Sequence, residues 1–195
     1  MRNKNIYANT AEFFIYILFR IKYRFELKNK MPHTTNGIVL IGNHTSFIDW
    51  AFLQFGAQQK IHFFIEKEIY EKPFLKPFLS FFGALPIDSK NVKDSFKKGL
   101  EILSNGGIVA IFPEGELTKN GEISEFKRGF EFLAQKSDAD VIPFYLHGLY
   151  GSRFSKKPDF LFKRRSVSLV FGNVLKNTDT ALARKAVMEL RFKLI

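Results

Sequence analysis

The sequence predicts an α/β fold in which a central, mostly parallel or mixed sheet is flanked by helices. Short apolar runs, typical of buried strands, alternate along the chain with segments whose apolar residues recur at helical spacing. The clearest run, 108–112, reads IVAIF and follows a pair of glycines that would end the preceding helix. A length of 195 residues fits one domain with a substantial core, and no repeat or long linker interrupts it.

The other elements follow from the same two periodicities. Further strands are expected at 38–41, 61–65, 83–88, 141–146 and 167–171, and helices at 92–103, from about 129 to 136, and at 179–195. His62 lies inside one of these strands and is expected to be a packed strand residue. Between 66 and 82 apolar residues recur at helical spacing, but Pro73 and Pro77 predict two short helices or a kink. Their apolar stripe either packs in the core, lines an apolar groove or dips into a bilayer.

The composition favours a partner with negative charge. Lysine and arginine number 30 against 19 aspartates and glutamates, the formal net charge is +11, and the chain holds 24 phenylalanines. A basic surface favours nucleic acid, anionic lipid or a phosphorylated substrate, and the excess of phenylalanine favours lipid. The chain has no cysteine, which excludes disulfides, thiolate nucleophiles and cysteine-ligated zinc. A solvated basic protein without a special partner is the alternative.

Residues 1–30 are predicted to form an amphipathic helix at a membrane interface. The unbroken apolar run 13–19 is followed by Arg20, Lys22 and Arg24, and an aromatic segment with basic residues behind it suits the headgroup region. The run is too short to span a bilayer, which requires about 20 apolar residues. No small-residue cleavage site follows, so a signal peptide is not expected. The alternatives are a helix that packs on the core and the end of an upstream membrane domain.

The segment NHTSFID at 43–49 carries the strongest chemical signal. A strand that ends at Gly42 is followed by a helix whose expected N-cap is Ser46, with Asp49 three residues later as in a capping box. Residues five apart on one regular helix point about 140° away from each other, so His44 meets Asp49 only from the turn before the helix. A carboxylate that orients an imidazole makes His44 a candidate general base. The alternative is a plain helix cap beside a loop histidine.

A second turn, FPEGE at 112–116, follows the central strand. Ligands bind outside the carboxyl ends of strands in open α/β sheets, so both turns are expected at one rim. Glu114 supplies a carboxylate there, and Gly115 lets the backbone approach a ligand closely. The sequence has no nucleophile elbow, no phosphate-cradling GxxxxGK and no cluster of histidine and carboxylate at metal-ligand spacing. A base with a carboxylate, but without nucleophile or metal, suits direct transfer to a hydroxyl held beside the base.

Together the two turns resemble those of the PlsC-like glycerophospholipid acyltransferases. The family's H-x4-D motif matches His44 to Asp49 within a fully matched NHxSxxD context, and the resemblance extends over residues 35–175. The supporting matches are Asn43 and Ser46 in the first block, residues 83–90 in the second, Phe112, Pro113, Glu114 and Gly115 in the third, and Val141, Ile142 and Pro143 in the fourth.

The resemblance implies acyl transfer from an acyl thioester, either acyl-CoA or acyl carrier protein, to the free hydroxyl of lysophosphatidic acid. His44 would be the general base, oriented by Asp49, and Glu114 and Gly115 would lie at the acceptor site. The expected phosphate contacts are Lys67, Lys90 and Arg128. The implied catalytic domain is 31–195, at the cytoplasmic face of a membrane as a peripheral or monotopic protein, with anionic lipid as a partner. The thioester is a co-substrate, and no cofactor or metal is expected.

Two departures from the family pattern favour a different head group. The family often has Thr-Arg after FPEG, where this chain has Glu116-Leu117, and Arg at the end of the second block, where it has Ser89-Lys90. Fewer arginines at the phosphate leave lysophosphatidylethanolamine as an alternative acceptor, with Glu116 near its ammonium. An alternative of another class is a non-catalytic membrane-binding module. Nucleic acid is not an expected partner, because the basic residues are scattered and no nucleic-acid motif is present.

Overall fold

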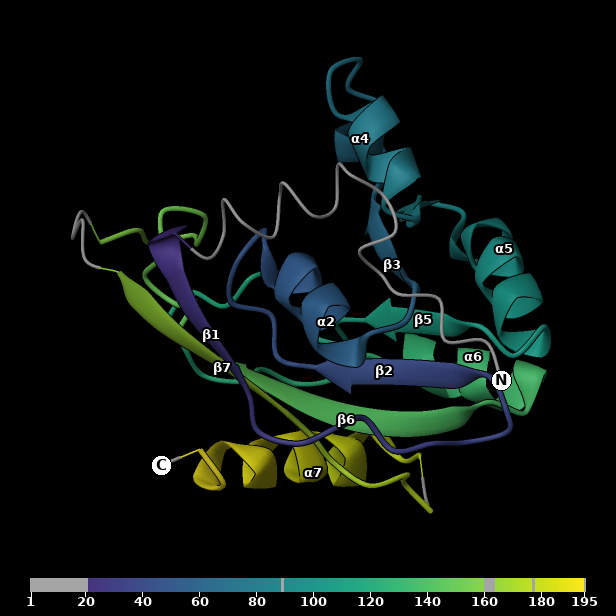
Figure 1. Ribbon diagram of the computed structural model, residues 1–195. Helices are drawn as coiled ribbons and strands as arrows, with labels where there is room; N and C mark the ends of the chain where they lie inside the picture. Colours follow the sequence, from purple (N-terminus) through teal and green to yellow (C-terminus); the bar gives the residue numbers. More distant parts are fainter. Residues whose placement is uncertain (1–20, 89, 160–163, 177, 195) are drawn as a thin grey trace.

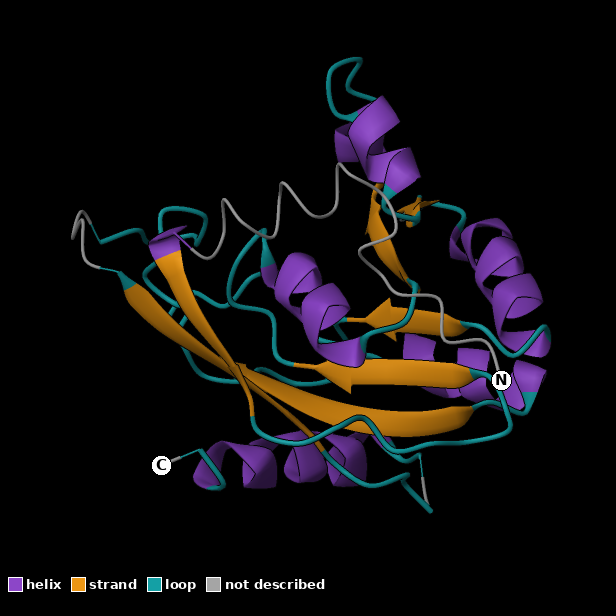
Figure 2. Cartoon of the chain, viewed as in Figure 1, coloured by secondary structure: helices purple, strands orange, loops and turns teal. Residues whose placement is uncertain are grey.

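A computed structural model of the chain describes residues 21–88, 90–159, 164–176 and 178–194. A seven-stranded sheet runs through the molecule in the order β1-β7-β6-β2-β5-β3-β4 (Figure 1). Its strands are β1 (Tyr23–Leu27), β2 (Ile38–Gly42), β3 (Ile61–Glu66), β4 (Ala84–Ile87), β5 (Ile108–Ile111), β6 (Asp140–His147) and β7 (Arg165–Phe171). The helices are α2 (Asp49–Ala57), α3 (Lys67–Tyr70), α4 (Lys76–Phe81), α5 (Val92–Ser104), α6 (Gly129–Ser137) and α7 (Thr180–Phe192). Figure 2 shows that helices cover both faces of the sheet, so the predicted α/β architecture is confirmed.

The strands are mostly parallel, as the sequence predicted. At the centre, β2 pairs in parallel with β5 on one side and β6 on the other. Only β6 and β7 pair antiparallel among the described strands. Because parallel strands end at the same edge of a sheet, the chain leaves β2 and β5 side by side. The two turns singled out in the sequence are therefore neighbours.

The centre of the sheet is buried on both faces, and β2 shows this clearly. All five of its residues are buried. Leu40 belongs to the core on the side of α2, whereas Val39 and Ile41 belong to the core formed with α5, α6 and α7. A strand with a core on each face needs an apolar residue at every position, which explains the unbroken run IVLI. The site that follows β2 is thus built on a rigid, fully packed element.

The predicted N-terminal helix is wrong over its last part. Residues 23–27 form β1, which pairs in parallel with β7 at the edge of the sheet. Tyr23 is only 4% exposed, and Arg24 lies on this strand, not on a helix. The sequence YRFEL alternates apolar and charged residues with the period of two that a half-buried strand requires. The apolar run 13–19 and Arg20 lie outside the described residues.

No described helix is long and apolar enough to cross a membrane. Segment 66–82 folds into two short helices, α3 and α4, as predicted from its prolines. Pro73 lies between the two helices, and Pro77 lies in the first turn of α4, where a missing N–H leaves no hydrogen bond unmade. The helices α5, α6 and α7 begin and end within a few residues of the predicted bounds.

His62 is a packed strand residue, as predicted. Its Nδ1 lies 3.0 Å from the carbonyl oxygen of Gly83. Burial, together with the nearby Lys60, lowers the pKa of the His62 imidazole below its ordinary value. The residue lies on β3, on the far side of β5 from β2, and takes no part in the site described below.

Candidate active site

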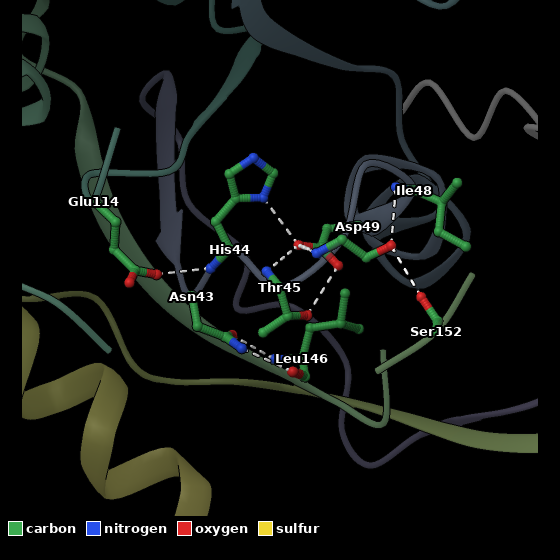
Figure 3. A network of polar contacts seen from close by, with 9 residues as sticks. Asn43, His44, Thr45, Ile48, Asp49, Glu114, Leu146 and Ser152 are labelled. Atoms are coloured by element: carbon green, nitrogen blue, oxygen red, sulfur yellow. Dashed lines mark hydrogen bonds and ion pairs between the residues drawn. The ribbon is translucent and has the colours of Figure 1, made fainter. Parts of the chain in front are cut away.

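The end of β2 places a histidine at the rim of the sheet. Gly42 ends the strand, and a Cβ at this position would come within 2.4 Å of the Phe144 ring. Asn43 then extends the pairing of β2 with β6 through its side chain: Nδ2 donates to the carbonyl of Leu146 at 2.9 Å, and Oδ1 accepts from the Leu146 N–H at 2.8 Å. These two hydrogen bonds fix the direction in which the chain leaves the sheet, so the strand determines the position of His44 (Figure 3).

His44 and Asp49 are in direct contact, as the spacing predicted. Nδ1 of His44 lies 2.9 Å from Oδ2 of Asp49. Asp49 has no exposed side-chain surface, whereas the side chain of His44 is 22% exposed. In Figure 3 the second ring nitrogen, Nε2, points away from the carboxylate. A carboxylate at Nδ1 keeps the proton on that nitrogen and leaves Nε2 free to accept one.

The carboxylate of Asp49 is held by the backbone as well as by the imidazole. Its Oδ2 accepts from the N–H groups of Thr45 at 2.6 Å and Ser46 at 2.9 Å, and its Oδ1 accepts from the Thr45 hydroxyl at 3.2 Å. Asp49 is also the first residue of α2, where negative charge is favoured. All of these partners donate hydrogen bonds, which stabilises the ionised carboxylate. Asp49 therefore acts as a hydrogen-bond acceptor toward the His44 ring.

The predicted N-cap at Ser46 is wrong. The helix begins at Asp49, so its N-cap is Ile48, which makes no side-chain cap hydrogen bond. The Ser46 hydroxyl lies instead 3.3 Å from that of Ser152 and 3.5 Å from the Ile48 N–H. The reason is geometric: the N–H of Ser46 points at Asp49, and two further residues are needed before the chain turns into the helix. Ser46 therefore joins the motif to the loop after β6.

Glu114 holds the main chain of His44. Its Oε1 accepts the His44 N–H at 2.8 Å, and its Oε2 accepts the N–H and hydroxyl of Ser124 at 2.8 and 2.9 Å. The residue is 3% exposed. Both oxygens thus accept from protein donors, so Glu114 holds the backbone of His44 and Ser124, and its place at the acceptor site stays a prediction. Thr118 completes the arrangement, because its N–H donates to the His44 carbonyl at 2.9 Å.

The remaining motif residues support the site from behind. The ring of Phe112 stacks on the His44 imidazole, with centroids 4.0 Å apart and planes 14° apart. The carbonyl of Pro113 accepts from the N–H of Lys127. Ile142 and Pro143 lie in β6, opposite Leu40 and Ile41 of β2, and both are buried. They stabilise the strand that carries His44 but do not line the site.

Two of the three basic residues assigned to the acceptor phosphate, Lys67 and Lys90, lie at the same carboxylate, that of Asp88. The Nζ of Lys67 pairs with Asp88 at 3.1 Å, and the N–H of Lys90 donates to the other Asp88 oxygen at 2.9 Å. Arg128 is 86% exposed and pairs with Glu131 in the first turn of α6, at 2.8 Å. These are contacts of exposed side chains and of one backbone N–H, so the assignment of Lys67, Lys90 and Arg128 to the acceptor phosphate stays a prediction.

The group missed by the sequence reasoning is Lys127. Gly115 has a φ of +73°, and a Cβ there would come within 2.5 Å of the Lys127 Nζ. The glycine is therefore needed twice: for its left-handed backbone and for the room it leaves to the ammonium. Lys127 stands beside Arg128 in the sequence FKRG, and nothing in that string distinguishes the two.

Glu116 lies within the same basic surroundings. Its carboxylate pairs with Lys156 at 2.8 Å and lies 3.8 Å from Lys119. The hydrogen bond from Lys156, with the charges of Lys119 and Lys127, lowers the pKa of Glu116 below its ordinary value. Leu117, which stands where the family often has Arg, is 5% exposed. The side chain of an arginine at position 117 would therefore start from a buried Cβ. The other departure from the family pattern, Ser89, lies outside the described residues.

Comparison with known proteins agrees with this geometry. The family model described as Acyltransferase matches residues 22–147. A 1-acyl-sn-glycerol-3-phosphate acyltransferase of Bacillus subtilis is 31% identical over 156 residues, which cover 79% of this chain and 74% of that protein. A chloroplastic 1-acyl-sn-glycerol-3-phosphate acyltransferase of Arabidopsis thaliana is 32% identical over 143 residues, which cover 71% of this chain but only 39% of the plant protein.

The fold also has a solved counterpart. The crystal structure of the 1-acyl-sn-glycerophosphate (LPA) acyltransferase, PlsC, from Thermotoga maritima matches with a TM-score of 0.71. The match covers 94% of this chain and 76% of that chain, at 22% sequence identity. At this identity the similarity shows the fold.

Proposed function

Because the chain belongs to the acyltransferase family, we propose that it transfers a fatty acyl chain from a thioester to the free hydroxyl of lysophosphatidic acid. The observation that carries the proposal is the contact between Nδ1 of His44 and the buried Asp49 at the carboxyl end of β2. It provides an oriented base with one free ring nitrogen at the rim where ligands bind in open α/β sheets.

The proposed reaction needs no covalent intermediate on the enzyme. The Nε2 of His44 takes the proton of the acceptor hydroxyl while that oxygen attacks the carbonyl carbon of the thioester. A new C–O bond forms and the C–S bond breaks. The proton then passes from His44 to the leaving thiolate, which gives a diacylated phospholipid and a free thiol. Asp49 stabilises the imidazolium formed on the way.

The choice of acceptor rests on relatives and on local charge. The relatives described above are named as acting on 1-acyl-sn-glycerol 3-phosphate. The argument for lysophosphatidylethanolamine weakens, because it required a site-facing side chain at Leu117 and an available carboxylate at Glu116. Leu117 is buried, and Glu116 is already paired with Lys156 and close to Lys119. We therefore take lysophosphatidic acid as the acceptor and lysophosphatidylethanolamine as its competitor in the test.

We further propose that the protein works at a membrane surface, where its acceptor resides. Large apolar side chains are exposed on and before α4, which stands away from the sheet in Figure 1; they are Phe74 (96% exposed), Leu75 (39%), Phe78 (40%) and Phe81 (43%). Exposed apolar patches of this kind mark interaction sites, and the net charge of +11 favours anionic lipid. The membrane contact predicted for residues 13–24 stays a prediction.

The experiment is a thiol-release assay with purified protein and a matrix of substrates. The acceptors are lysophosphatidic acid and lysophosphatidylethanolamine, and the donors are acyl-CoA and acyl carrier protein. We expect turnover with lysophosphatidic acid to exceed that with the ethanolamine lipid. Which donor is used follows from the same matrix. Absence of acyl transfer with every pair, or a strong preference for the ethanolamine lipid, would contradict the proposal.

Membrane association is measured separately. Co-sedimentation with anionic and with neutral vesicles should show stronger binding to the anionic ones, weakened by salt. Phe74→Ser with Phe78→Ser should reduce binding, whereas Phe192→Ser, which removes a 73% exposed phenylalanine from the end of α7, serves as the control. Equal binding of the double variant and the parent chain would exclude α4 as the contact. A non-catalytic membrane module would bind vesicles and release no thiol.

A further inference from the structure

A group of lysines stands beside the catalytic turn without an assigned role. It consists of Lys119, Lys127 and Lys156, and we call it the lysine cluster. Lys156 and Lys119 lie 2.8 and 3.8 Å from the carboxylate of Glu116. Lys127 adds to the lowering of the Glu116 pKa, so it also lies within electrostatic range. One carboxylate thus pairs with two ammonium groups, and a third lies over the neighbouring Gly115, which leaves an excess of positive charge.

The cluster is tied to His44 by the chain itself. Glu116 lies between Glu114 and Thr118, and these two residues hold the N–H and the carbonyl of His44. The loop that carries Lys156 is attached to the other side of the motif, because the N–H of Phe47 donates to the carbonyl of Phe154 at 2.9 Å. The positive charge is therefore fixed on the same rim as the base.

Lys127 is the member that is free to bind a ligand. Its side chain is exposed, and its ammonium has no carboxylate partner within 4.0 Å among the described residues. The ammonium lies over Gly115, where the absence of a Cβ leaves it uncovered. Arg128, next in sequence, differs because it is paired with Glu131. An ammonium without a carboxylate partner, over the turn that holds the backbone of His44, is suited to a substrate anion.

We propose that Lys127, assisted by Lys119 and Lys156, binds a phosphate group of a substrate of the reaction. The inference rests on the proposed function and deepens it, because it names the side chains that select a phosphorylated substrate. Phosphate oxygens accept charge-assisted hydrogen bonds from lysine, which acts as a point charge. Glu116 holds the two flanking lysines in place until the phosphate competes for them. The phosphate belongs either to the head group of the acceptor or to the nucleotide part of acyl-CoA.

The kinetic test compares Lys127→Gln with Lys136→Gln in the full chain. Lys136 is an exposed lysine in the last turn of α6 and supplies a matched change of charge. Lysophosphatidic acid is compared with monoacylglycerol, which has no phosphate, and acyl-CoA is compared with S-acyl-pantetheine, which also has none. We expect Lys127→Gln to raise the KM of the phosphorylated substrate by about tenfold or more, with kcat within about twofold, since hydrogen bonds to charged groups are worth this much.

The four substrates separate the two sources of phosphate. A higher KM for lysophosphatidic acid with either donor assigns the cluster to the acceptor, and a higher KM for acyl-CoA alone assigns it to the donor. Equal KM values for Lys127→Gln and Lys136→Gln would overturn the inference, as would an equal rise for phosphate-free substrates. In these two cases the parent chain still transfers acyl groups, so the proposed function stands.

A second measurement does not require turnover. Inorganic phosphate should raise the Tm of the parent chain and of Lys136→Gln by more than it raises that of Lys127→Gln, because a ligand that binds the folded state stabilises it. The buffer contains no sulfate and its ionic strength is kept constant, so that a change in Tm reflects phosphate binding and not a general effect of salt on stability. If the three proteins respond equally to phosphate, the lysine cluster is not a phosphate site, whatever reaction the protein performs.

Discussion

Two buried carboxylates contact His44 at different groups: Asp49 contacts the ring and Glu114 contacts the main chain. Asp49 is unexposed and contacts the ring at Nδ1, with the N–H groups of Thr45 and Ser46 as its other main partners. Glu114 is 3% exposed and contacts the main chain of His44, with Ser124 as its second partner. Each oxygen of both carboxylates accepts at least one hydrogen bond from the protein.

The difference lies in what each carboxylate controls. Asp49 is local to the motif and determines which ring nitrogen carries the proton. Glu114 comes from the turn after β5 and joins that turn to the end of β2, so it determines where the histidine is. A change at either buried carboxylate should cost stability, because each accepts backbone N–H groups. A change at Asp49 should in addition alter the chemistry of the ring, whereas a change at Glu114 should alter the position of His44.

Removing the group that both carboxylates hold should have the largest effect. We expect His44→Ala to lower kcat by about 10²–10⁴-fold, the usual contribution of a general base. The fold does not depend on the ring, because the backbone of His44 is held by Glu114 and Thr118, so circular dichroism should be unchanged and Tm should fall only modestly. His62→Ala, on β3, is the comparison for loss of an imidazole. Near-parental turnover of His44→Ala would rule out the base assignment.

Asp49→Asn tests the ring-bound carboxylate. We expect kcat to fall by up to about 10²-fold, because an amide can donate to Nδ1 and so favour the wrong tautomer of His44. Asp94→Asn, in the first turn of α5, is the control for a helix-terminal charge; it should cost at most about 1 kcal/mol of stability. Kinetics and melting are measured on the same samples. If Asp49→Asn loses only stability, like its control, then Asp49 merely stabilises α2.

Glu114→Gln tests the carboxylate that holds the backbone. One oxygen becomes an NH2 group that faces the N–H of His44 or of Ser124, which leaves a buried donor unsatisfied and costs about 1–3 kcal/mol. We expect kcat to fall by about tenfold through misplacement of His44. Glu101→Gln, exposed on α5, is the control. A variant with unchanged Tm and a fall in kcat as large as that of Asp49→Asn would break the distinction between the two carboxylates.

The smallest effect is expected for Ser124→Ala. The hydroxyl is one of two groups that Ser124 gives to Glu114, and the N–H remains. Loss of one hydrogen bond of this kind costs about 1 kcal/mol, and kcat should stay within about twofold. The measurement is the free energy of unfolding from urea titration, with Ser137→Ala on α6 as control. A kcat loss as large as that of Glu114→Gln would show that Glu114 positions His44 only when the Ser124 hydroxyl is present.

Much of the fold could be predicted because its signals are local. The runs that became β2, β5 and β6 are apolar at nearly every position, since each is buried on both faces. The helices α5 and α7 follow from spacing, and the two prolines predicted the break between α3 and α4. The error at β1 arose because the apolar run 13–19 and the basic residues after it suggested one helix, so the five alternating residues of β1 were interpreted as its end.

The contact between His44 and Asp49 was determined by the sequence itself, because two side chains five residues apart at a strand-to-helix turn can meet only in a few ways. The tertiary structure decided what surrounds them. Glu114 lies 70 residues from His44, and only the parallel pairing of β2 with β5 brings its carboxylate to the histidine N–H. The packing of Lys127 over Gly115, the burial of Leu117 and the pairing of Arg128 with Glu131 likewise depend on the path of the chain between β5 and α6. Short-range spacing determines the contact between His44 and Asp49. The charged side chains around this pair are placed by the order of the strands in the sheet, and no single stretch of sequence contains that order.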